Sequence, residues 1–187
     1  MNIGTKTLLF GNHQFALHPL FVLLAWIKLY GMPDWRELVC IIIHDWGYWG
    51  SPNLDGREGE DHAIRSGNLV VNRFFTKKGE LFYTWAYYYR DLIWYHSRFI
   101  SRRHNHRPSK LCLADKYGVA LMPSWLWVFL GKLTGEITEY QSNKKYEIYQ
   151  EGRENAFDWF RAYKRICQRW VEARDPTITW SEAEKGA

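Results

Sequence analysis

The stretch DWRELVCIIIHDWG, residues 34–47, carries more structural information than any other part of the chain. Asp34, followed three residues later by Glu37, has the capping-box pattern that begins a helix. The apolar run after it ends at two adjacent ionisable residues, His44 and Asp45. Burying such groups without compensation costs free energy, and a bound metal ion supplies that compensation. The stretch therefore predicts a buried helix that delivers a histidine and an aspartate to a metal ion.

The apolar pattern on both sides of this stretch has helical spacing, which predicts an all-α protein without strands. The expected helices cover about 18–30, 34–45, 60–75, 80–97, 109–121, a short segment after 123–124, and 144–174. The segment 46–59 is rich in Gly, Pro, Asn and Asp and is expected to be a functional loop. A basic loop is expected at 101–107 and a loose tail after residue 176.

Length and composition favour one soluble domain, residues 1–187. The net charge of +5 suits an anionic ligand. The basic residues are dispersed, apart from the cluster of Arg98, Arg102, Arg103 and Arg107, so no dedicated nucleic-acid domain is expected. The apolar segments 15–31 and 119–130 contain charged residues or proline and fall short of the roughly 20 residues of a membrane span.

The three cysteines, Cys40, Cys112 and Cys167, are far apart and form no CxxC pair. This pattern favours buried, reduced thiols. The N-terminus has no signal-peptide pattern. We therefore expect a cytoplasmic protein that acts as a monomer or a simple homo-oligomer.

Four more residues of metal-ligand type surround the His44-Asp45 dipeptide in the order His18, His62, His96 and Asp115. Imidazole nitrogen and carboxylate oxygen together bind Fe, Zn, Mn or Co. A lone buried histidine is usually a core residue, so the prediction rests on the whole set. His13 is an alternative to His18 as the first ligand.

This ordered series resembles the HD superfamily, helical metal-dependent phosphohydrolases named after the dipeptide. In that family an upstream histidine opens the series and a distant aspartate closes it, as His18 and Asp115 do here. His62 and His96 are similar to the additional histidines of dinuclear members. The resemblance covers about residues 13–122 and implies an HD-domain-like helical bundle. Residues 123–187 would then form C-terminal helices packed on this metal core.

The resemblance further implies two divalent metal ions, with Fe, Mn, Co or Zn as candidates and Mg as a further one. The first would be held by His18, His44, Asp45 and Asp115, and the second by His62 and His96, with Asp45 bridging. The implied activity is hydrolysis of a phosphoester in a nucleotide or similar small anionic substrate through a metal-activated water.

Candidate catalytic residues are Asp45, Lys116 and Glu60, and candidate substrate-binding residues are Lys110, Arg65, Arg98, Arg102 and Tyr48. His104 and His106 in the basic loop lie on the surface or substrate side, or else complete the second metal site.

Two alternatives remain open. Some dinuclear members are mixed-valent diiron oxygenases, whose ligands are the same, and a non-catalytic metal-binding or regulatory module would also fit.

Overall fold

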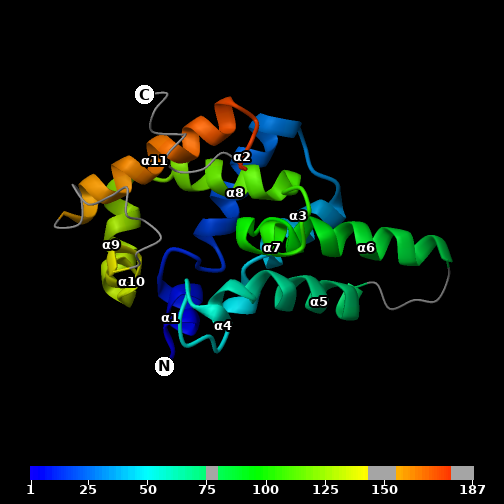
Figure 1. Cartoon of the computed structure of the whole chain (residues 1–187), viewed down its shortest axis with the longest axis horizontal. Coiled ribbons are helices and arrows are strands. Elements are labelled where there is room, and N and C mark those ends of the chain that lie inside the picture. The colour runs from blue at the N-terminus through cyan, green and yellow to red at the C-terminus, as the bar shows by residue number, and fades with distance from the viewer. Residues whose placement is uncertain (75–79, 143–154, 178–187) are drawn as a thin grey trace.

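The computed structural model describes residues 1–74, 80–142 and 155–177, and within these residues it is built of helices without a β-strand (Figure 1). This confirms the all-α prediction. In chain order the elements are α1 (Ile3–Phe10), α2 (Leu17–Tyr30), α3 (Trp35–Ile43), the 3-10 turn η1 (Trp46–Tyr48), α4 (Arg57–Glu60), α5 (His62–Phe74), α6 (Glu80–Trp94), α7 (Arg98–Arg103), α8 (Lys110–Leu121), α9 (Ser124–Thr134), α10 (Glu136–Ser142) and α11 (Ala156–Glu172).

The start of α3 has the predicted capping box. The Asp34 carboxylate accepts hydrogen bonds from the backbone N–H groups of Arg36 and Glu37, at 2.7 and 2.8 Å. In return, the Glu37 carboxylate accepts from the Asp34 N–H at 2.9 Å. The helix then buries Cys40 and two isoleucines and ends at Ile43, so that the next two residues stand at its inner end. The sequence thus determines both where α3 begins and what it delivers.

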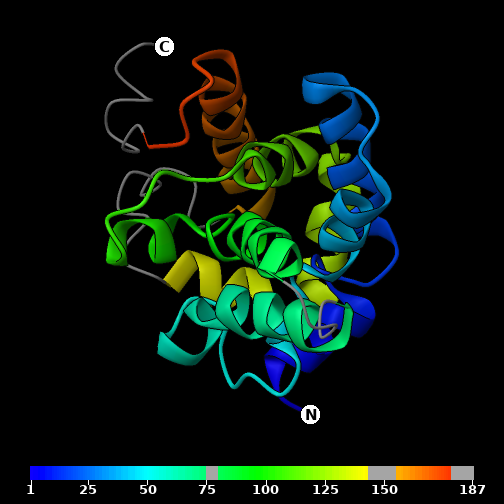
Figure 2. The same ribbon diagram turned by 90° about the vertical axis from the view of Figure 1, so that its right-hand side faces the viewer.

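Helix α8 lies at the centre of the molecule, with α2 along one side and α11 along another (Figures 1 and 2). At Gly118 of α8, an added Cβ would lie 3.0 Å from the Val22 backbone nitrogen of α2. Glycine therefore allows these two helix backbones to approach closely. The other flank is formed by α5 and α6, which lie side by side as an antiparallel pair.

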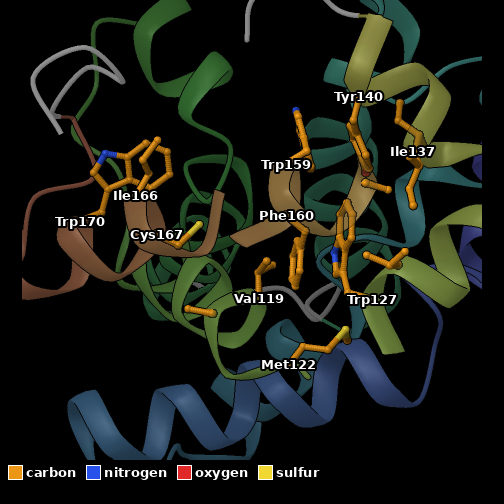
Figure 3. Close-up of a cluster of buried hydrophobic side chains, with 14 of the residues drawn as sticks. Val119, Met122, Trp127, Ile137, Tyr140, Trp159, Phe160, Ile166, Cys167 and Trp170 are labelled. Atoms are coloured by element: carbon orange, nitrogen blue, oxygen red, sulfur yellow. The ribbon is translucent and has the colours of Figure 1, made fainter. Parts of the chain in front are cut away.

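Two groups of buried apolar side chains hold these helices together. One lies between α2, α3, α6 and α8 and includes Trp26, Ile41 and Ile93. The other joins α8, α9, α10 and α11 and is strongly aromatic (Figure 3). In it the rings of Trp127 and Phe160 stack with centroids 4.1 Å apart. Aromatic rings therefore supply much of the helix-to-helix packing in the C-terminal part of the chain.

Several element boundaries differ from the predictions. Helices α1 and α10 were not predicted, and α7 occupies residues 98–103, which overlap the expected loop at 101–107. Such short helices depend on tertiary contacts rather than on propensity, and α7 illustrates this because its Ile100 is fully buried. The final helix begins at Ala156, and residues 144–154 of the predicted helix lie outside the described residues.

The three cysteines are unpaired and buried, as predicted. Burial raises the pKa of the Cys112 and Cys167 thiols to about 12, which keeps them protonated. No helix among the described residues is both long and apolar enough to cross a membrane.

Candidate metal centre

All six predicted ligand residues come together in one buried cluster. His18 lies in the first turn of α2, His44 and Asp45 follow the last residue of α3, and His62 begins α5. His96 lies between α6 and α7, and Asp115 is in the middle of α8. Each of these side chains is almost fully buried. Segments that are distant in sequence therefore supply one buried cluster of histidine and aspartate side chains.

Four side-chain atoms form the first donor set. His18 Nε2 lies 3.1 Å from His44 Nε2, 3.1 Å from Asp45 Oδ2 and 3.3 Å from Asp115 Oδ1. His44 Nε2 lies 3.4 Å from Asp45 Oδ2 and 4.0 Å from Asp115 Oδ1. Two donor atoms that share one ion at about 2.1 Å are themselves roughly 3.0–3.4 Å apart in octahedral or tetrahedral geometry. Four of these five distances match that spacing, and the fifth, from His44 to Asp115, is longer.

Three atoms form the second donor set, next to the first. His62 Nε2 lies 3.2 Å from His96 Nε2, and each of these nitrogens lies 3.4 Å from Asp45 Oδ1. The two carboxylate oxygens of Asp45 are thus divided between the two sets. Asp45 is the residue that the sets share.

The ring orientations of the histidines indicate that these atoms could bind a metal ion. The Nδ1 groups of His44, His62 and His96 each lie 2.5–2.7 Å from a backbone carbonyl oxygen of Ile41, Gly59 and Ile93, respectively. A carbonyl can only accept, so each Nδ1 must donate a proton. The neutral ring then has its lone pair on Nε2, and the lone pairs of His62 and His96 point at each other. A cation between them resolves this conflict, and such carbonyl-anchored imidazoles are typical of metal-bound histidine.

His13 occupies a supporting position. Its Nδ1 lies 2.6 Å from Asp45 Oδ2, and its Nε2 lies 3.1 Å from the hydroxyl of Tyr140. Of the two candidates for the first ligand, His18 belongs to the first donor set and His13 does not. His13 orients the shared carboxylate from outside, although its ring nitrogen is close enough to count as a further potential ligand.

The charges of the cluster are strongly coupled. Burial raises the pKa of Asp45, but the neighbouring His44 and His13 outweigh it and hold the pKa well below the usual range. Burial likewise raises the pKa of Asp115, but Lys116 and His18 hold it well below the usual range. The Lys116 ammonium donates to Asp115 Oδ2 at 2.7 Å. Burial opposes protonation of Lys116, yet Asp115 raises its pKa above the usual value. Both carboxylates are therefore ionised, and Lys116 is a permanent cation beside them.

Two neighbouring histidines have opposite protonation states. Burial lowers the pKa of His18, but hydrogen bonds with Asp115 and Asp45 outweigh it and raise the pKa to about 9. Burial lowers the pKa of His44 to about 3, helped by its neighbours His96 and His18. The pKa of His62 is also lowered, mainly by burial.

A cavity of about 450 Å³ opens onto both donor sets. Its walls include Asp45, His62, His96 and Asp115 together with five of the predicted catalytic or substrate-binding residues, which are Tyr48, Glu60, Arg98, Arg102 and Lys116. The cavity also reaches the C-terminal helix α11 through Tyr163 and Trp170. We call it the metal cavity.

Two predicted substrate-binding residues lie elsewhere. Arg65 donates hydrogen bonds to the Ser51 hydroxyl and, at 2.7 Å, to the Glu58 carbonyl, so it fastens the loop before α5. Lys110 lies with its ammonium 5.6 Å from the centre of the Tyr30 ring. Neither residue is part of the cavity wall. His104 and His106 are exposed and lie outside both donor sets.

A smaller chamber of about 110 Å³ adjoins the metal cavity and touches His18 and Asp115. Its walls combine polar residues with aromatic ones that include Tyr48, Trp127 and Tyr140. Asn12 also lines it, and within the described residues neither polar atom of this buried amide has a hydrogen-bond partner. Nothing in the sequence around Asn12 indicated this role, because the chamber forms only when α9–α11 pack on the loop before α2.

The tight turn after the dipeptide positions His62. A Cβ added to Gly47 would lie 1.9 Å from the His62 carbonyl oxygen, so only glycine allows this approach. Tyr48, the next residue, stacks on the His62 ring with centroids 3.9 Å apart and an angle of 11° between the planes. The HDWGY segment therefore supplies two donor residues and also fixes a third.

Comparisons of the chain with models of protein families, with curated proteins and with solved structures give no match. The buried His/Asp cluster is compatible with the HD-type site expected from the sequence. It shows a site that could bind metal, without assigning the chain to a family.

Proposed function

We propose that this protein is an HD-type metallohydrolase that binds two divalent transition-metal ions and hydrolyses a phosphoester in a small anionic substrate. One observation carries the proposal. The unprotonated Nε2 atom of His62 faces that of His96, His18 faces His44, and the two oxygens of Asp45 are divided between these pairs. That arrangement fits two adjacent cations bridged by one carboxylate.

His18, His44, Asp45 and Asp115 would hold one ion, and His62, His96 and Asp45 the other. Two such ions lower the pKa of water and bind the oxygens of a phosphoester during displacement. Asp45 and Asp115 supply two negative charges to this centre. Lys116, bound to the outer oxygen of Asp115, keeps that carboxylate in place and presents a positive charge to the metal cavity.

The other cations in the cavity wall support an anionic substrate. Arg98 and Arg102 line the cavity and can bind phosphate oxygens with a bidentate fork. Glu60 also lines it, outside the donor sets, and we assign to its carboxyl group the transfer of a proton to the leaving oxygen. Hydrolysis then breaks the phosphorus–oxygen bond and adds water across it.

The smaller chamber beside the metal cavity favours a nucleotide among such substrates. Its aromatic wall residues suit a flat ring, and the amide of Asn12 offers one donor and one acceptor group. An unsatisfied buried amide costs free energy, which a ring with hydrogen-bonding edges would recover.

Element-resolved metal analysis of the protein, purified without chelators, tests the proposal. We expect about two Mn, Co, Zn or Fe ions per chain, together with hydrolysis in a screen of nucleotides. Asp45→Ala should lose both the metal and the activity, whereas Arg103→Ala, which removes a charge outside the metal cavity, should keep both. Retention of two ions by the Asp45→Ala protein would refute the bridging assignment.

The same analysis separates the alternatives. Two irons per chain with substrate-dependent O₂ consumption, and no phosphate release, would identify a diiron oxygenase instead. Failure to bind metal even after reconstitution of the folded protein would refute a metalloenzyme of either kind.

A further inference from the structure

We propose that a pocket beside the metal cavity binds a second anionic group of the substrate, so that the substrate carries a phosphate or pyrophosphate besides the phosphoester that is cleaved. This inference rests on the proposed function for its catalytic meaning. The pocket has a volume of about 280 Å³, and its walls include Arg98, Arg102, His106, Arg107, Pro176 and Thr177. We call it the basic pocket.

The basic pocket adjoins the metal cavity because Arg98 and Arg102 line both. These two residues lie in α7, four positions apart, and therefore project from the same side of the helix. The Arg98 guanidinium lies over the Trp170 ring of α11, 3.9 Å from its centre. One molecule can therefore occupy the metal cavity and the basic pocket at the same time, with the two arginines between its ends.

The far wall of the basic pocket is held in a defined shape. After α7 the chain turns through Asn105, whose φ of 50° is left-handed, and the His106 N–H donates to the Ser101 carbonyl at 2.8 Å. The His106 ring stacks on Tyr95, with centroids 3.7 Å apart and an angle of 13° between the planes. His106 Nδ1 donates to the Arg107 carbonyl at 2.7 Å, so the Arg107 backbone is fixed relative to that ring.

The C-terminal side of the pocket is also anchored. The Asp175 N–H donates to the Trp170 carbonyl at 3.0 Å, and Asp175 Oδ1 accepts from the Thr177 N–H and hydroxyl at 2.8 and 2.6 Å. These hydrogen bonds and the charges of Arg107 and Arg98 lower the pKa of Asp175. The pocket wall contains three arginines, and the charges of two of them act on the nearby Asp175 carboxylate, so the pocket retains an excess of positive charge.

This excess identifies the chemical class of the ligand. Guanidinium groups bind phosphate with charge-assisted, paired hydrogen bonds. The metal cavity by itself accounts for one phosphate, at the donor sets, whereas Arg107 and His106 lie in the basic pocket alone. A substrate with a single phosphate would leave these two residues unused.

Binding of inorganic pyrophosphate, measured by calorimetry at low salt, tests the basic pocket without requiring catalysis. We expect Arg107→Ala to weaken binding about tenfold, the loss typical of a charge-assisted contact. Arg103→Ala is the matched control, because Arg103 ends α7 four residues before Arg107 but pairs with Asp61 at 3.0 Å and lines neither cavity. Equal affinities of the Arg107→Ala and Arg103→Ala proteins would overturn the proposal.

Repeating the titration in the Asp45→Ala background removes the contribution of the donor sets. If the Asp45→Ala protein folds, the tenfold difference in affinity between its Arg107→Ala and Arg103→Ala forms should persist. If the Asp45→Ala protein does not fold, the titration in the otherwise unmodified chain decides. Kinetics then connect the pocket to the reaction. Arg107→Ala should raise KM for a substrate with two phosphate groups and leave KM for one with a single phosphate and both kcat values unchanged.

The two proposals can fail separately. Pyrophosphate binding that depends on Arg107 in a protein without hydrolytic activity would keep the basic pocket and refute the hydrolase. Hydrolysis of single-phosphate and double-phosphate substrates with no effect of Arg107→Ala would keep the hydrolase and refute the pocket.

Discussion

His18 and His44 lie 3.1 Å apart yet differ in protonation near neutral pH. His18, with a pKa of about 9, holds a proton when no metal is bound, while His44, with a pKa of about 3, holds none. A metal ion can bind only to the unprotonated nitrogen, so metal binding must displace the His18 proton.

We therefore expect metal binding at pH 7.5 to release about one proton from His18, and this release to decline as the pH rises through about 9. The direction follows from a raised pKa: the proton is fully bound below the folded-state value and is lost above it. Calorimetric titrations in buffers with different ionisation enthalpies measure the count. No proton release at pH 7.5 would contradict the protonation state assigned to His18.

His13 supports the Asp45 carboxylate from outside the donor sets. Its hydrogen bond to Asp45 Oδ2 orients the carboxylate that both donor sets share. His13→Ala should weaken metal affinity by about 10–100-fold, the usual effect of losing an outer-shell partner, while the number of ions bound at saturation stays the same. His106→Ala, outside the donor sets, serves as the control. A lower saturating stoichiometry would show that His13 is itself a ligand.

At this scale the sequence predicts the donor residues but not their supports. The six residues that cluster could be selected from the sequence because histidine and aspartate have few other uses in apolar helices. Lys110 lies close to Asp115 in sequence, which suggested a role in substrate binding. Five residues of α8 nevertheless place Lys110 about 140° around the helix axis from Asp115, away from the cavity. That Asn12 lines a chamber could not be predicted, because the chamber's walls include residues of the distant helices α9 and α11.

At the scale of elements, the 3-10 turn η1 controls the position of His62 in the second donor set. Gly47→Ala would force a methyl group against the His62 carbonyl. We expect a loss of about 1–3 kcal/mol in the free energy of unfolding, as in other overpacked sites, and loss of metal from the His62–His96 pair. Thermal denaturation and metal analysis measure the two effects.

Gly50→Ala is the matched control for this substitution. Gly50 has a φ of +78°, but no atom lies within 4 Å of an added Cβ. It should cost about 1–2 kcal/mol through backbone strain alone and leave metal content unchanged. Equal metal content in the two variants would contradict the positioning role of Gly47.

The long helices were predictable and the short ones were not. Helix α3 has a capping box and α2 ends before Gly31, so their local signals agree with their tertiary roles. Helix α7 has six residues and a basic composition that is typical of a loop. It forms because Ile100 is buried and Ser97 accepts a hydrogen bond from the Ile100 N–H at 3.3 Å. Burial of this kind depends on partners that the local sequence does not specify.

At the scale of the whole molecule, the donor sets connect α2, α3, α5, α8 and the segment after α6. Ions bound there stabilise the folded chain by mass action, by about 4 kcal/mol at a thousandfold excess over Kd. For a chain of this length we expect a chelator to lower Tm by roughly 8–16 °C. Scanning calorimetry with and without chelator measures the shift. The Asp45→Ala protein should show almost none, and an equal shift in that variant would place the stabilising ions elsewhere.

The C-terminal helices contribute more than packing to this molecule. They were expected only to pack on a metal core at 13–122, yet α11 supplies Tyr163 and Trp170 to the metal cavity. Residues 123–187 have no recognisable motif, because aromatic side chains that line a cavity have the same spacing as those that fill a core.

The separation of the donor residues along the chain, from 18 to 115, also affects folding kinetics. Such a site requires the closure of several long loops, which is costly before the helices have packed. We therefore expect the donor atoms to converge only after the folding transition state. Interactions absent from that state slow unfolding and leave the folding rate nearly unchanged. Bound ions would then extend the lifetime of the native protein without helping it to form.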